Sequence, residues 1–549
     1  MSKKRVLLMS EAHYLNSGFG TYAKELITRL HKTDKYDLAE FAAYGRTDTG
    51  KDVPWLVYGN MPGENNQEET NVYNSNGAHQ FGAWRFDKVC LDFKPDIVLC
   101  YRDPWMDNWI QDTATRPYFH WVWMPTVDSS PQRQEWVDTF SKCDALLAYS
   151  EFGGKVIEEQ GKERVNFVGC ASPGIDPNIY KPLPKQQLRT EMGIDPNCFI
   201  VGTVMRNQKR KLFFELMKSF RLFLDQAPSA IASKSFLYLH TSYPEKNGWD
   251  IPDGIMQNNL GGKVLMTYIC KNCRQFFPSL FKDALTKCKF CNQVSAVCPT
   301  VSYGISVPDL AKIYNLLDIY VQYAICEGFG MPQVEAAACG VPVAATDYSA
   351  MYDVLRFTQG YPIPVRTFFR EIETNAERAY PDNEVLASIL TKFFSKNPTD
   401  RMQESMVVRK KTIERYNWDD TVKVWENYID SYTPTGLQGQ WESPPALRNV
   451  PQSIPPDMSN EDFIKWLFFE VAHAPEKLHQ YEGVKLHRDF QYGAEIGQGM
   501  LEPIDREKIF KIYQQKTNNK NQIEQIRGQK IPLTDSFLLE AHQLKEVSQ

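Results

Sequence analysis

Two carboxylates flank a glycine-bearing loop in the stretch CEGFGMPQVEAAACGVPV, residues 326–343. Glu327 precedes the Gly-Phe-Gly loop of residues 328–330, and Glu335 lies about one turn into the helix predicted to follow. Glycines permit backbone conformations that other residues avoid, Pro332 suits a first helical turn, and the free N–H groups at a helix start hold anions. The stretch therefore predicts a site for a ligand that carries a phosphate and several hydroxyls. The alternative is an ordinary strand-turn-helix unit whose glutamates face solvent.

The sequence RNQKRK, residues 206–211, concentrates four cations between a buried-strand pattern and a helical pattern. Arg binds a phosphate through two parallel hydrogen bonds, and Lys binds it as a compact point charge. The alternative is a solvated helix N-terminus, but the helix dipole disfavours positive charge at that end. The run therefore favours a functional role for these cations over a solvated helix start.

With both patterns in view, EGFGMPQVEAAACGVPV closely resembles the E-x7-E signature of the retaining, nucleotide-sugar-dependent glycosyltransferases of the GT-B fold, a group similar to glycosyltransferase family 4. The agreement includes both glutamates, Gly-Phe-Gly, the proline, the Ala-rich helix and Gly-x-Pro-Val. The resemblance implies that Glu327 contacts the donor sugar and Glu335 the nucleotide ribose. It covers roughly residues 1–432, apart from an insert described below.

Two further stretches resemble the same family. GTVMRNQKRKLFFELM resembles its basic pair, which implies that Arg206 and Lys211 neutralise the donor diphosphate and leaves Lys209 and Arg210 spare. NSGFGTYAKEL resembles its glycine-rich loop facing the donor phosphates, although many Rossmann-like turns look similar. The residues implied for donor binding are Gly18, Gly20, Gly328, Phe329, Gly330 and Glu335, and those implied for catalysis are Arg206, Lys211, Glu327 and Asp128.

Members of the family also carry a His or an Asp at the end of a later N-domain strand, and FHWVWMPTVDSSP contains His120 and Asp128. A long aromatic strand is expected over 116–125, which favours Asp128 at its end and places His120 inside it. His120 stays an acceptor-side candidate, with a satisfied core histidine as the alternative. The segment YRDPWMDNW adds Arg102, Asp103 and Trp105 as candidates for an acceptor wall, with simple aromatic packing as the alternative.

Four of the twelve cysteines are clustered in CKNCRQFFPSLFKDALTKCKFC. The two C-x2-C pairs suit tetrahedral thiolate coordination, so Cys270, Cys273, Cys288 and Cys291 are predicted to hold a structural Zn²⁺; the alternative is redox chemistry or chance. Four thiolates leave no open position for catalysis, and Cys298 is expected to be a bystander. The module interrupts the chain after the strand pattern GGKVLMTY, which favours a place near the mouth of a cleft. It serves either acceptor or partner recognition or only as a stabilised surface insertion.

Alternating strand and helix patterns must position these groups, and they predict an α/β protein with two Rossmann-like domains facing a cleft. The expected division is an N-terminal acceptor-side domain over 1–180 and a donor-binding domain over 195–432, with the zinc insert at 266–300. A proline-rich linker, 433–458, and a helical accessory region, 459–549, are expected to follow. A helical stretch over about 400–432 resembles the last helix of the family, which crosses back to the N-terminal domain.

Composition limits the setting of this chemistry. A net charge of −5 and a pI of about 6.1 give no global basic field for nucleic acid or an acidic membrane, although a local patch stays open. The apolar run VLLM is too short for a signal peptide, and no stretch approaches the ~18 apolar residues that span a bilayer. Scattered cysteines in strand patterns suit a reducing compartment. A cytoplasmic protein without a transmembrane segment is expected.

The resemblance implies a retaining glycosyltransferase, a hexosyl- or pentosyltransferase, that moves a sugar from a nucleotide-sugar to a hydroxyl acceptor. Because cationic side chains carry the diphosphate charge, no catalytic metal is expected. The acceptor stays open between a modified DNA base, as in phage DNA modification, and a glycan, a lipid or a small molecule. The alternative from another class is a non-catalytic nucleotide-sugar-binding or nucleic-acid-binding protein that keeps the fold. Nothing in the sequence predicts the sugar, the nucleotide or the oligomeric state.

Overall fold

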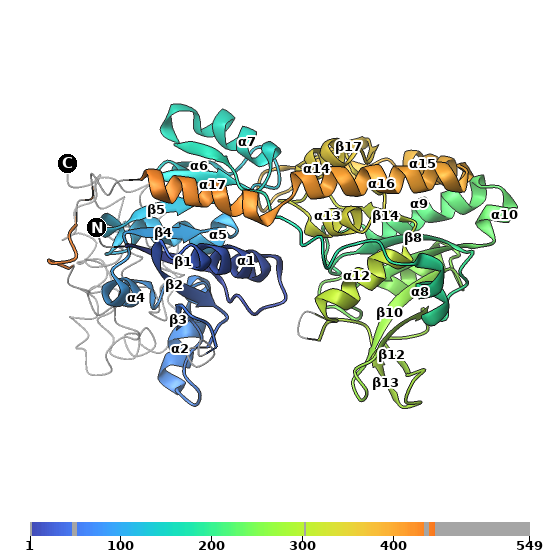
Figure 1. Cartoon of the computed structure of the whole chain (residues 1–549), viewed down its shortest axis with the longest axis horizontal. Helices are drawn as coiled ribbons and strands as arrows, with labels where there is room; N and C mark the ends of the chain where they lie inside the picture. Colours follow the sequence, from blue (N-terminus) through green and yellow to red (C-terminus); the bar gives the residue numbers. More distant parts are fainter. Residues whose placement is uncertain (1–2, 47–51, 301–302, 433–436, 438, 445–549) are drawn as a thin grey trace, which may run out of the picture.

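The computed structural model describes residues 3–46, 52–300, 303–432, 437 and 439–444. These residues form two α/β halves that lie side by side, at the left and right of Figure 1. The predicted helical region 459–549 and most of the predicted linker 433–458 lie outside the described residues.

The N-terminal half is built on a parallel sheet with the strand order β3-β2-β1-β4-β5-β6-β7. Its strands are β1 Lys4–Glu11, β2 Tyr36–Ala43, β3 Leu56–Gly59, β4 Ile97–Cys100, β5 His120–Trp123, β6 Ala145–Ala148 and β7 Phe167–Cys170. Its α-helices are α1 Gly18–Lys32, α2 Gln67–Ser75, α3 Gly77–Gln80, α4 Phe86–Phe93, α5 Pro104–Asp107, α6 Gln134–Phe140 and α7 Glu151–Gly161. A parallel sheet covered on both faces explains why the central strands are continuous apolar runs.

One strand is shorter than expected. The strand predicted over 116–125 is limited to β5, because Arg116–Tyr118 forms a 3₁₀ turn whose Pro117 has no N–H to give to a sheet. His120 is therefore the first residue of β5 and not an interior one.

The C-terminal half contains a nine-stranded sheet with the order β12-β13-β10-β9-β8-β14-β15-β16, and β11 pairs with β10. Its strands are β8 Phe199–Val204, β9 Ser235–His240, β10 Val264–Cys270, β11 Phe276–Leu280, β12 Leu285–Lys287, β13 Val294–Val297, β14 Ile319–Gln322, β15 Val343–Thr346 and β16 Tyr361–Ile363. Strands β10, β9, β8, β14, β15 and β16 pair in parallel, whereas β11, β12 and β13 are antiparallel additions. In Figure 1, β12 and β13 form the lower tip of this half.

Helices flank the second sheet, and a separate hairpin follows it. The helices are α8 Lys185–Glu191, α9 Phe213–Gln226, α10 Ser229–Ala232, α11 Ile251–Gln257, α12 Val307–Leu316, α13 Met331–Ala338, α14 Ala350–Thr358 and α15 Asn383–Ser395. The hairpin consists of β17 Val365–Arg370 and β18 Glu377–Pro381.

The last described helices connect the two halves. The helical stretch expected over 400–432 is divided into α16 Pro398–Arg415 and α17 Trp418–Ser431, because Asn417 takes an extended conformation and its side chain caps α17 by accepting the Asp419 N–H. In Figure 1, α16 lies along the right half and α17 along the left half. The Trp425 indole N–H on α17 donates to the Tyr22 hydroxyl on α1 at 2.7 Å.

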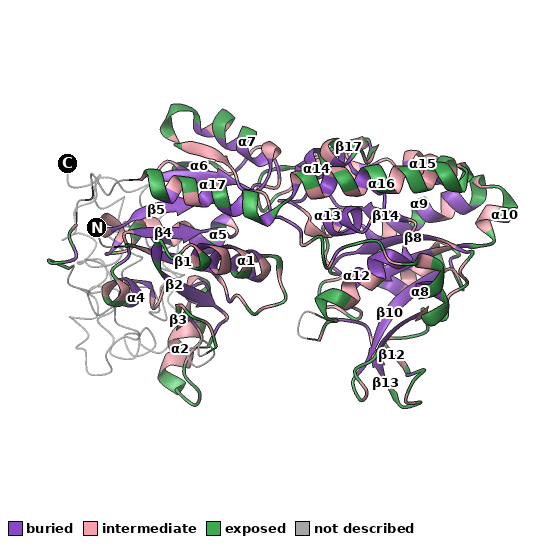
Figure 2. Ribbon diagram, in the orientation of Figure 1, coloured by how far each residue is buried: buried purple, intermediate pink, exposed green. Residues whose placement is uncertain are grey.

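Buried side chains join the halves as well. Figure 2 shows the strands of both sheets as mainly buried and the outer helices as partly exposed. The largest apolar cluster extends from Leu8 on β1 to Val334 on α13 and includes Trp425. The predicted fold class, two Rossmann-like units facing each other, is therefore confirmed. Among the described residues, no helix has both the length and the hydropathy to cross a membrane.

Candidate functional site

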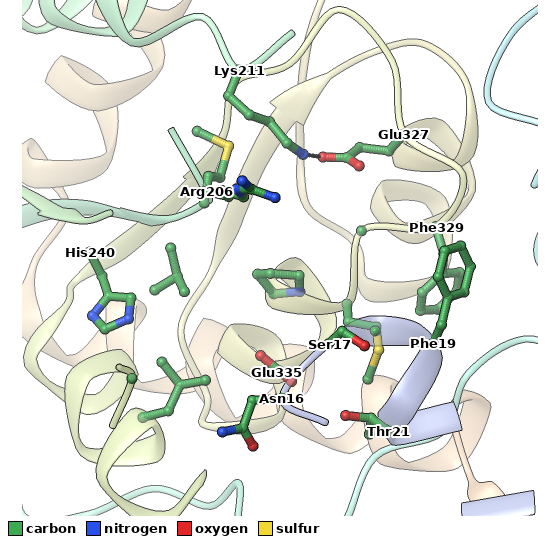
Figure 3. Close-up of a pocket in the computed structure, with 18 of the residues that line it drawn as sticks. Asn16, Ser17, Phe19, Thr21, Arg206, Lys211, His240, Glu327, Phe329 and Glu335 are labelled. Carbon is green, nitrogen blue, oxygen red and sulfur yellow. Dashed lines mark hydrogen bonds and ion pairs between the residues drawn. The ribbon is translucent and has the colours of Figure 1, made fainter. Parts of the chain in front are cut away.

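A cavity of about 590 Å³ lies between the two halves. The N-terminal half lines it with the loop and first turn around α1, with Asp103 after β4, and with Thr126 and Tyr149. The C-terminal half lines it with residues that follow β8, β9 and β14 and with the start of α13. Ligands of open α/β sheets bind at the carboxyl ends of the strands, which is where this cavity lies. Figure 3 shows part of its lining.

The Gly-Phe-Gly loop brings the two halves close together. A Cβ at Gly328 would lie 2.3 Å from Thr126 Cγ2, so a larger residue there would have to displace Thr126 of the N-terminal half. Gly330 has a φ of +84° and is the N-cap of α13, and Pro332 lies in the first turn of that helix. The Phe329 ring is buried and lies edge-on to Tyr416, with ring centroids 5.5 Å apart. Gly328, Phe329 and Gly330 all line the cavity.

Glu327 is 4% exposed and forms ion pairs with two cations of the segment 206–211. Arg210 Nη1 lies 2.8 Å from Glu327 Oε2. Lys211 Nζ contacts Glu327 Oε1, and Figure 3 shows this second contact. Backbone pairing explains the contact, because the Ile325 N–H donates to the Arg210 carbonyl and Lys211 forms an antiparallel bridge with Ala324. The resemblance leaves Arg210 spare, whereas the structure pairs it with Glu327 and places it in the cavity lining.

Lys211 is almost fully buried at this wall of the cavity. Burial and the neighbouring Arg210 guanidinium lower the pKa of Lys211 well below its ordinary value. The nearby Asp128 carboxylate works against that shift, because a negative charge favours the ammonium form of Lys211. A polyanion bound here would likewise raise the pKa of Lys211, because it too would favour the ammonium form.

Arg206 lines the cavity from the chain just after β8. Its side chain is 51% exposed, and Nη2 lies 2.9 Å from Glu245 Oε1. The Ser242 hydroxyl donates to the other Glu245 oxygen at 2.6 Å. Arg206 and Lys211, the predicted pair, thus line one cavity, but one is held loosely at the surface and the other is buried against Glu327.

Glu335 is 8% exposed and accepts hydrogen bonds from two tyrosines. The Tyr314 hydroxyl donates to Oε2 at 2.6 Å, and the Tyr180 hydroxyl donates to Oε1 at 3.0 Å. Burial raises the pKa of Glu335 above its ordinary value, and the two hydroxyls limit the rise. Sequence reasoning missed both tyrosines, because Tyr180 comes from the segment between the sheets and Tyr314 from α12.

The first turn of α1 supplies the N-terminal side of the cavity. Ser17 caps this helix by accepting the Gly20 N–H at 3.0 Å, and Gly18 lines the cavity. Gly20 does not line it. Its role is steric, because a Cβ there would lie 2.5 Å from the Leu15 carbonyl oxygen.

Among the described residues of the N-terminal half, Asp103 is the one acidic residue that lines the cavity. Burial raises its pKa to about 6; the Thr126 hydroxyl works against the rise, and the nearby Asp128 carboxylate adds to it. This carboxyl therefore titrates close to neutral pH.

Asp128, the predicted catalytic residue, does not line the cavity. Its Oδ1 lies 2.8 Å from Arg378 Nη1 on β18, and the Cys326 thiol donates to Oδ2 at 3.2 Å. Burial would raise the pKa of Asp128, but Arg378 and the hydrogen bonds from Ser129 and Cys326 outweigh it and hold the pKa below its usual value. Its geometry is that of an ion pair between the two halves.

Three acceptor-side candidates also lie elsewhere. Arg102 is fully buried and pairs with Asp107, and Trp105 is half exposed with its ring edge-on to Phe81 at 5.0 Å. His120 lies at the amino end of β5, opposite the cavity-facing end, where its Nε2 is 2.8 Å from the Tyr428 hydroxyl. The expectation of an acceptor contact for His120 is therefore corrected.

The four cysteines of the predicted metal site come together. Their Sγ atoms lie within 4.8 Å of one another, with Cys270 to Cys291 at 3.5 Å and Cys273 to Cys288 at 3.7 Å. A tetrahedron with metal–sulfur bonds of about 2.3 Å has edges of roughly 3.8 Å, so this set of donors fits a zinc ion.

The two halves of the cysteine cluster have the same backbone geometry. Cys270 N–H donates to the Gln275 carbonyl at 3.0 Å, and Cys288 N–H donates to the Gln293 carbonyl at 2.8 Å. The residue after each second cysteine, Arg274 or Asn292, has a φ of +62°. Each C-x2-C pair is thus a tight knuckle that turns both thiols to the same side.

Comparison with known families adds to this geometry. Residues 300–366 match the glycosyl transferases group 1 family. The matched segment contains β14 and the residues that follow it, and Glu327, the Gly-Phe-Gly loop and part of α13 among these line the cavity.

Curated relatives of the chain are distant. A D-inositol 3-phosphate glycosyltransferase of Rhodococcus erythropolis is 21% identical over 294 residues, which are 53% of this chain and 54% of the relative. The enzyme of that name from Mycobacterium marinum is 25% identical over 207 residues, 37% of this chain and 35% of the relative. The chain thus matches about half or less of the length of these relatives.

Solved structures share the fold. Sucrose-phosphate synthase from Thermosynechococcus elongatus superposes with a TM-score of 0.55 at 14% identity and covers 78% of this chain and 100% of its own. Anabaena HepE, in complex with UDP and glucose, superposes with a TM-score of 0.53 at 13% identity and the same coverage. The two sheets, the cavity between them and these neighbours establish the GT-B fold.

Proposed function

We propose that the chain is a retaining glycosyltransferase that binds a nucleoside diphosphate sugar in the cavity between its two halves. The observation that carries the proposal is the placement of charge in that cavity. Lys211 and Arg210 converge on Glu327 at one wall, and Glu335 stands between two tyrosine hydroxyls at another. A donor that carries both negative charge and hydroxyl groups suits this lining. HepE, which shares the fold, has been solved in complex with UDP and glucose.

The diphosphate would lie against Arg206 and Lys211, and the residues at the starts of α1 and α13 line the same cavity. As the bond to the sugar breaks, negative charge develops on the leaving phosphate. A fixed cation at that point stabilises the transition state more than the ground state. Arg210 joins this pair in the proposal, because it reaches the same carboxylate as Lys211.

Glu327 and Glu335 would hold hydroxyl groups of the sugar and of the ribose. Since both lie in the C-terminal half, the donor would bind mainly to that half. Retention of the anomeric configuration fits a front-face reaction, in which the leaving phosphate takes the proton of the acceptor hydroxyl. Such a reaction needs no enzymic nucleophile, and Asp128 is not needed as one because Arg378 already holds it.

The acceptor hydroxyl would enter from the N-terminal half, past Asn16, Ser17 and Asp103. The two curated relatives described above are named for D-inositol 3-phosphate, which is a polyol phosphate. A hydroxyl on a small polyol or a glycan is therefore the acceptor class to test first. A DNA base and a lipid are tested beside it. The four cysteines would hold a structural zinc ion with no catalytic step assigned to it.

The test begins with binding, measured by calorimetry for UDP, GDP and ADP. Transfer is then assayed with the matching nucleotide-sugars, and the anomeric configuration of the product is assigned by NMR. We expect one nucleoside diphosphate to bind, transfer to a hydroxyl acceptor, and retention. Glu327→Ala should abolish transfer and donor hydrolysis. Absence of turnover with every donor, despite tight nucleotide binding, would favour a binding protein that keeps the fold. An inverted product would overturn the retaining assignment.

A further inference from the structure

We infer that the four-cysteine cluster shapes the end of the cavity nearest to it, so that metal and nucleotide bind cooperatively, with Tyr303 as the positioning residue that links them. This inference rests on the proposed function, because it assumes a nucleotide in the cavity. It assigns the cysteine module a role in donor binding, in place of a separate surface insertion or an acceptor-recognition module.

The first link joins the cysteine cluster to Tyr303. The Tyr303 hydroxyl donates to the Cys270 carbonyl at 2.9 Å, and the Arg274 guanidinium lies over the Tyr303 ring, 4.5 Å from its centroid. Both contacts come from the first knuckle, in which the Arg274 N–H also donates to the Cys270 carbonyl at 3.0 Å. A metal that closes this knuckle therefore fixes the atoms that hold Tyr303.

The second link joins Tyr303 to the cavity. The Thr300 N–H donates to the Tyr303 carbonyl at 2.9 Å, and the Tyr303 N–H donates to the Thr300 hydroxyl at 3.0 Å. Pro299, Thr300, Gly304 and Ile305, which lie on either side of Tyr303 in the sequence, line the cavity. Tyr303 thus anchors one wall of the cavity to a cysteine of the metal cluster.

A second part of the cavity lining is attached to strand β10. His240, Thr241 and Ser242 line the cavity at the carboxyl end of β9. His240 Nδ1 lies 2.9 Å from the hydroxyl of Thr267 on β10, the strand that ends at Cys270. Figure 3 places His240 at a distance from Lys211 and Glu327, on the far side of Arg206. Both parts of the lining at this end of the cavity are therefore attached to β10 and its terminal cysteine.

The position of this end indicates what it would hold. If the diphosphate lies at Arg206 and Lys211, the sugar at Glu327 and the ribose at Glu335, the nucleobase is the remaining part of the donor. Burial lowers the pKa of His240 to about 4, so at neutral pH the ring offers a neutral hydrogen-bonding nitrogen, which suits a base better than a phosphate. The cysteine cluster would then stabilise the walls that contact the base.

Thermodynamic reciprocity makes the inference testable without an activity assay. If the metal increases nucleotide affinity by some factor, the nucleotide must increase metal affinity by the same factor. Zinc affinity of the full chain is measured by competition with a chromophoric chelator, without nucleotide and with saturating UDP, or with GDP or ADP if UDP does not bind. We expect the nucleotide to tighten zinc binding about five- to tenfold, at the low end of the usual range of couplings.

Two variants locate the coupling. Tyr303→Phe removes the hydrogen bond to Cys270. The zinc affinities measured with and without nucleotide should then differ by no more than about twofold. One hydrogen bond contributes about 1 kcal/mol, so its removal should abolish most of the coupling. Tyr268→Phe is the matched control, because the Tyr268 hydroxyl donates to the Asp283 carbonyl at 2.9 Å on the same module, and Tyr268 does not line the cavity. It should keep the wild-type coupling.

The outcomes separate the two levels of the inference. Nucleotide binding without any change in zinc affinity would overturn the coupling and leave the proposed function standing. Wild-type coupling in Tyr303→Phe would overturn the assignment of Tyr303. A chain that binds none of the three nucleoside diphosphates would overturn the proposed function and this inference with it. A chain that binds no zinc would overturn the metal assignment and therefore the coupling, and it would leave the proposed function standing.

Discussion

Arg378 Nη1 lies 2.8 Å from Asp128 Oδ1, and the two residues belong to different halves of the chain. Arg378 also donates to Glu371 within its own hairpin, and its side chain is 7% exposed. The carboxylate that sequence resemblance assigned to sugar chemistry is therefore used to join β18 to the loop after β5. A catalytic carboxylate and an interdomain ion pair respond differently to substitution, so the two roles are separable.

Asp128→Asn should destabilise the chain by about 1–2 kcal/mol, because it leaves a buried guanidinium with one carboxylate partner in place of two. Nucleoside diphosphate binding should change little. The measurement is thermal unfolding across pH. The pKa of Asp128 is lowered by folding, so its contribution is present above the unfolded pKa near 4 and is lost as pH falls through the lower folded value. Loss of transfer with unchanged stability would instead support a catalytic Asp128.

The Glu327 carboxylate between Lys211 and Arg210 leads to a second prediction. Glu327→Gln leaves these two cations without their anion, and breaking a buried pair costs about 3–5 kcal/mol in typical cases. The ligand-free chain should therefore unfold at a lower temperature, and a bound nucleoside diphosphate should raise that temperature by more than it does in the wild type. Scanning calorimetry with and without UDP measures both. Gln322→Leu is the control, because Gln322 contacts Glu327 but carries no charge. An equal or smaller rise in Glu327→Gln would contradict the prediction.

The tyrosines beside Glu335 lead to a third. Tyr314→Phe removes the 2.6 Å hydrogen bond and should weaken nucleotide binding about three- to tenfold, the usual value of one hydrogen bond. If Glu335 holds the ribose, the preference for UDP over 2′-deoxy-UDP should fall as well. Calorimetry with both nucleotides tests this. Tyr323→Phe serves as the control, since Tyr323 is buried like Tyr314 but its hydroxyl bonds to Ser219 and Asn383 in place of Glu335. An unchanged preference in Tyr314→Phe would argue against the ribose role.

The sequence predicted the strongest parts of this arrangement well. Apolar runs of the length of IYVQYAI are buried in parallel sheets, and that pattern depends on local composition alone. The Gly-Phe-Gly loop and the clustered cysteines could also be predicted from the sequence, because each requires particular residues at fixed spacing. The family match over 300–366 falls on the same motif.

The rest could not be predicted because it depends on distant partners. Nothing near Asp128 in the sequence indicates Arg378, which is 250 residues away. His120 lies at the amino end of its strand, and that follows from where the 3₁₀ turn at Pro117 ends. Tyr180 reaches Glu335 from a segment that has neither helix nor strand character. Such contacts are set by tertiary packing, which overrides local pattern.

Asp103 leads to a prediction about pH. Its pKa is raised to about 6, so the group is a carboxylate at pH 7.5 and becomes protonated as pH falls through 6. If this carboxylate accepts a hydrogen bond from the acceptor, kcat/KM for transfer should fall on the acid side with a midpoint near 6. Asp103→Asn should lower transfer at pH 7.5 and remove that acid limb. An acid limb that persists unchanged in the variant would assign it to another group.

Removal of one cysteine tests the metal site directly. Cys273→Ser removes one of four sulfurs from a cluster that fits tetrahedral coordination, so zinc content should fall from about one ion per chain to well below one. The melting temperature should fall with it, because metal binding contributes to folding free energy. Cys298→Ser is the matched control: Cys298 is buried in the same module, yet it is not among the four clustered sulfurs. Zinc content measured by mass spectrometry should be unchanged in that control. Equal zinc loss in both variants would mean that general loosening of the module, and not ligand removal, releases the ion.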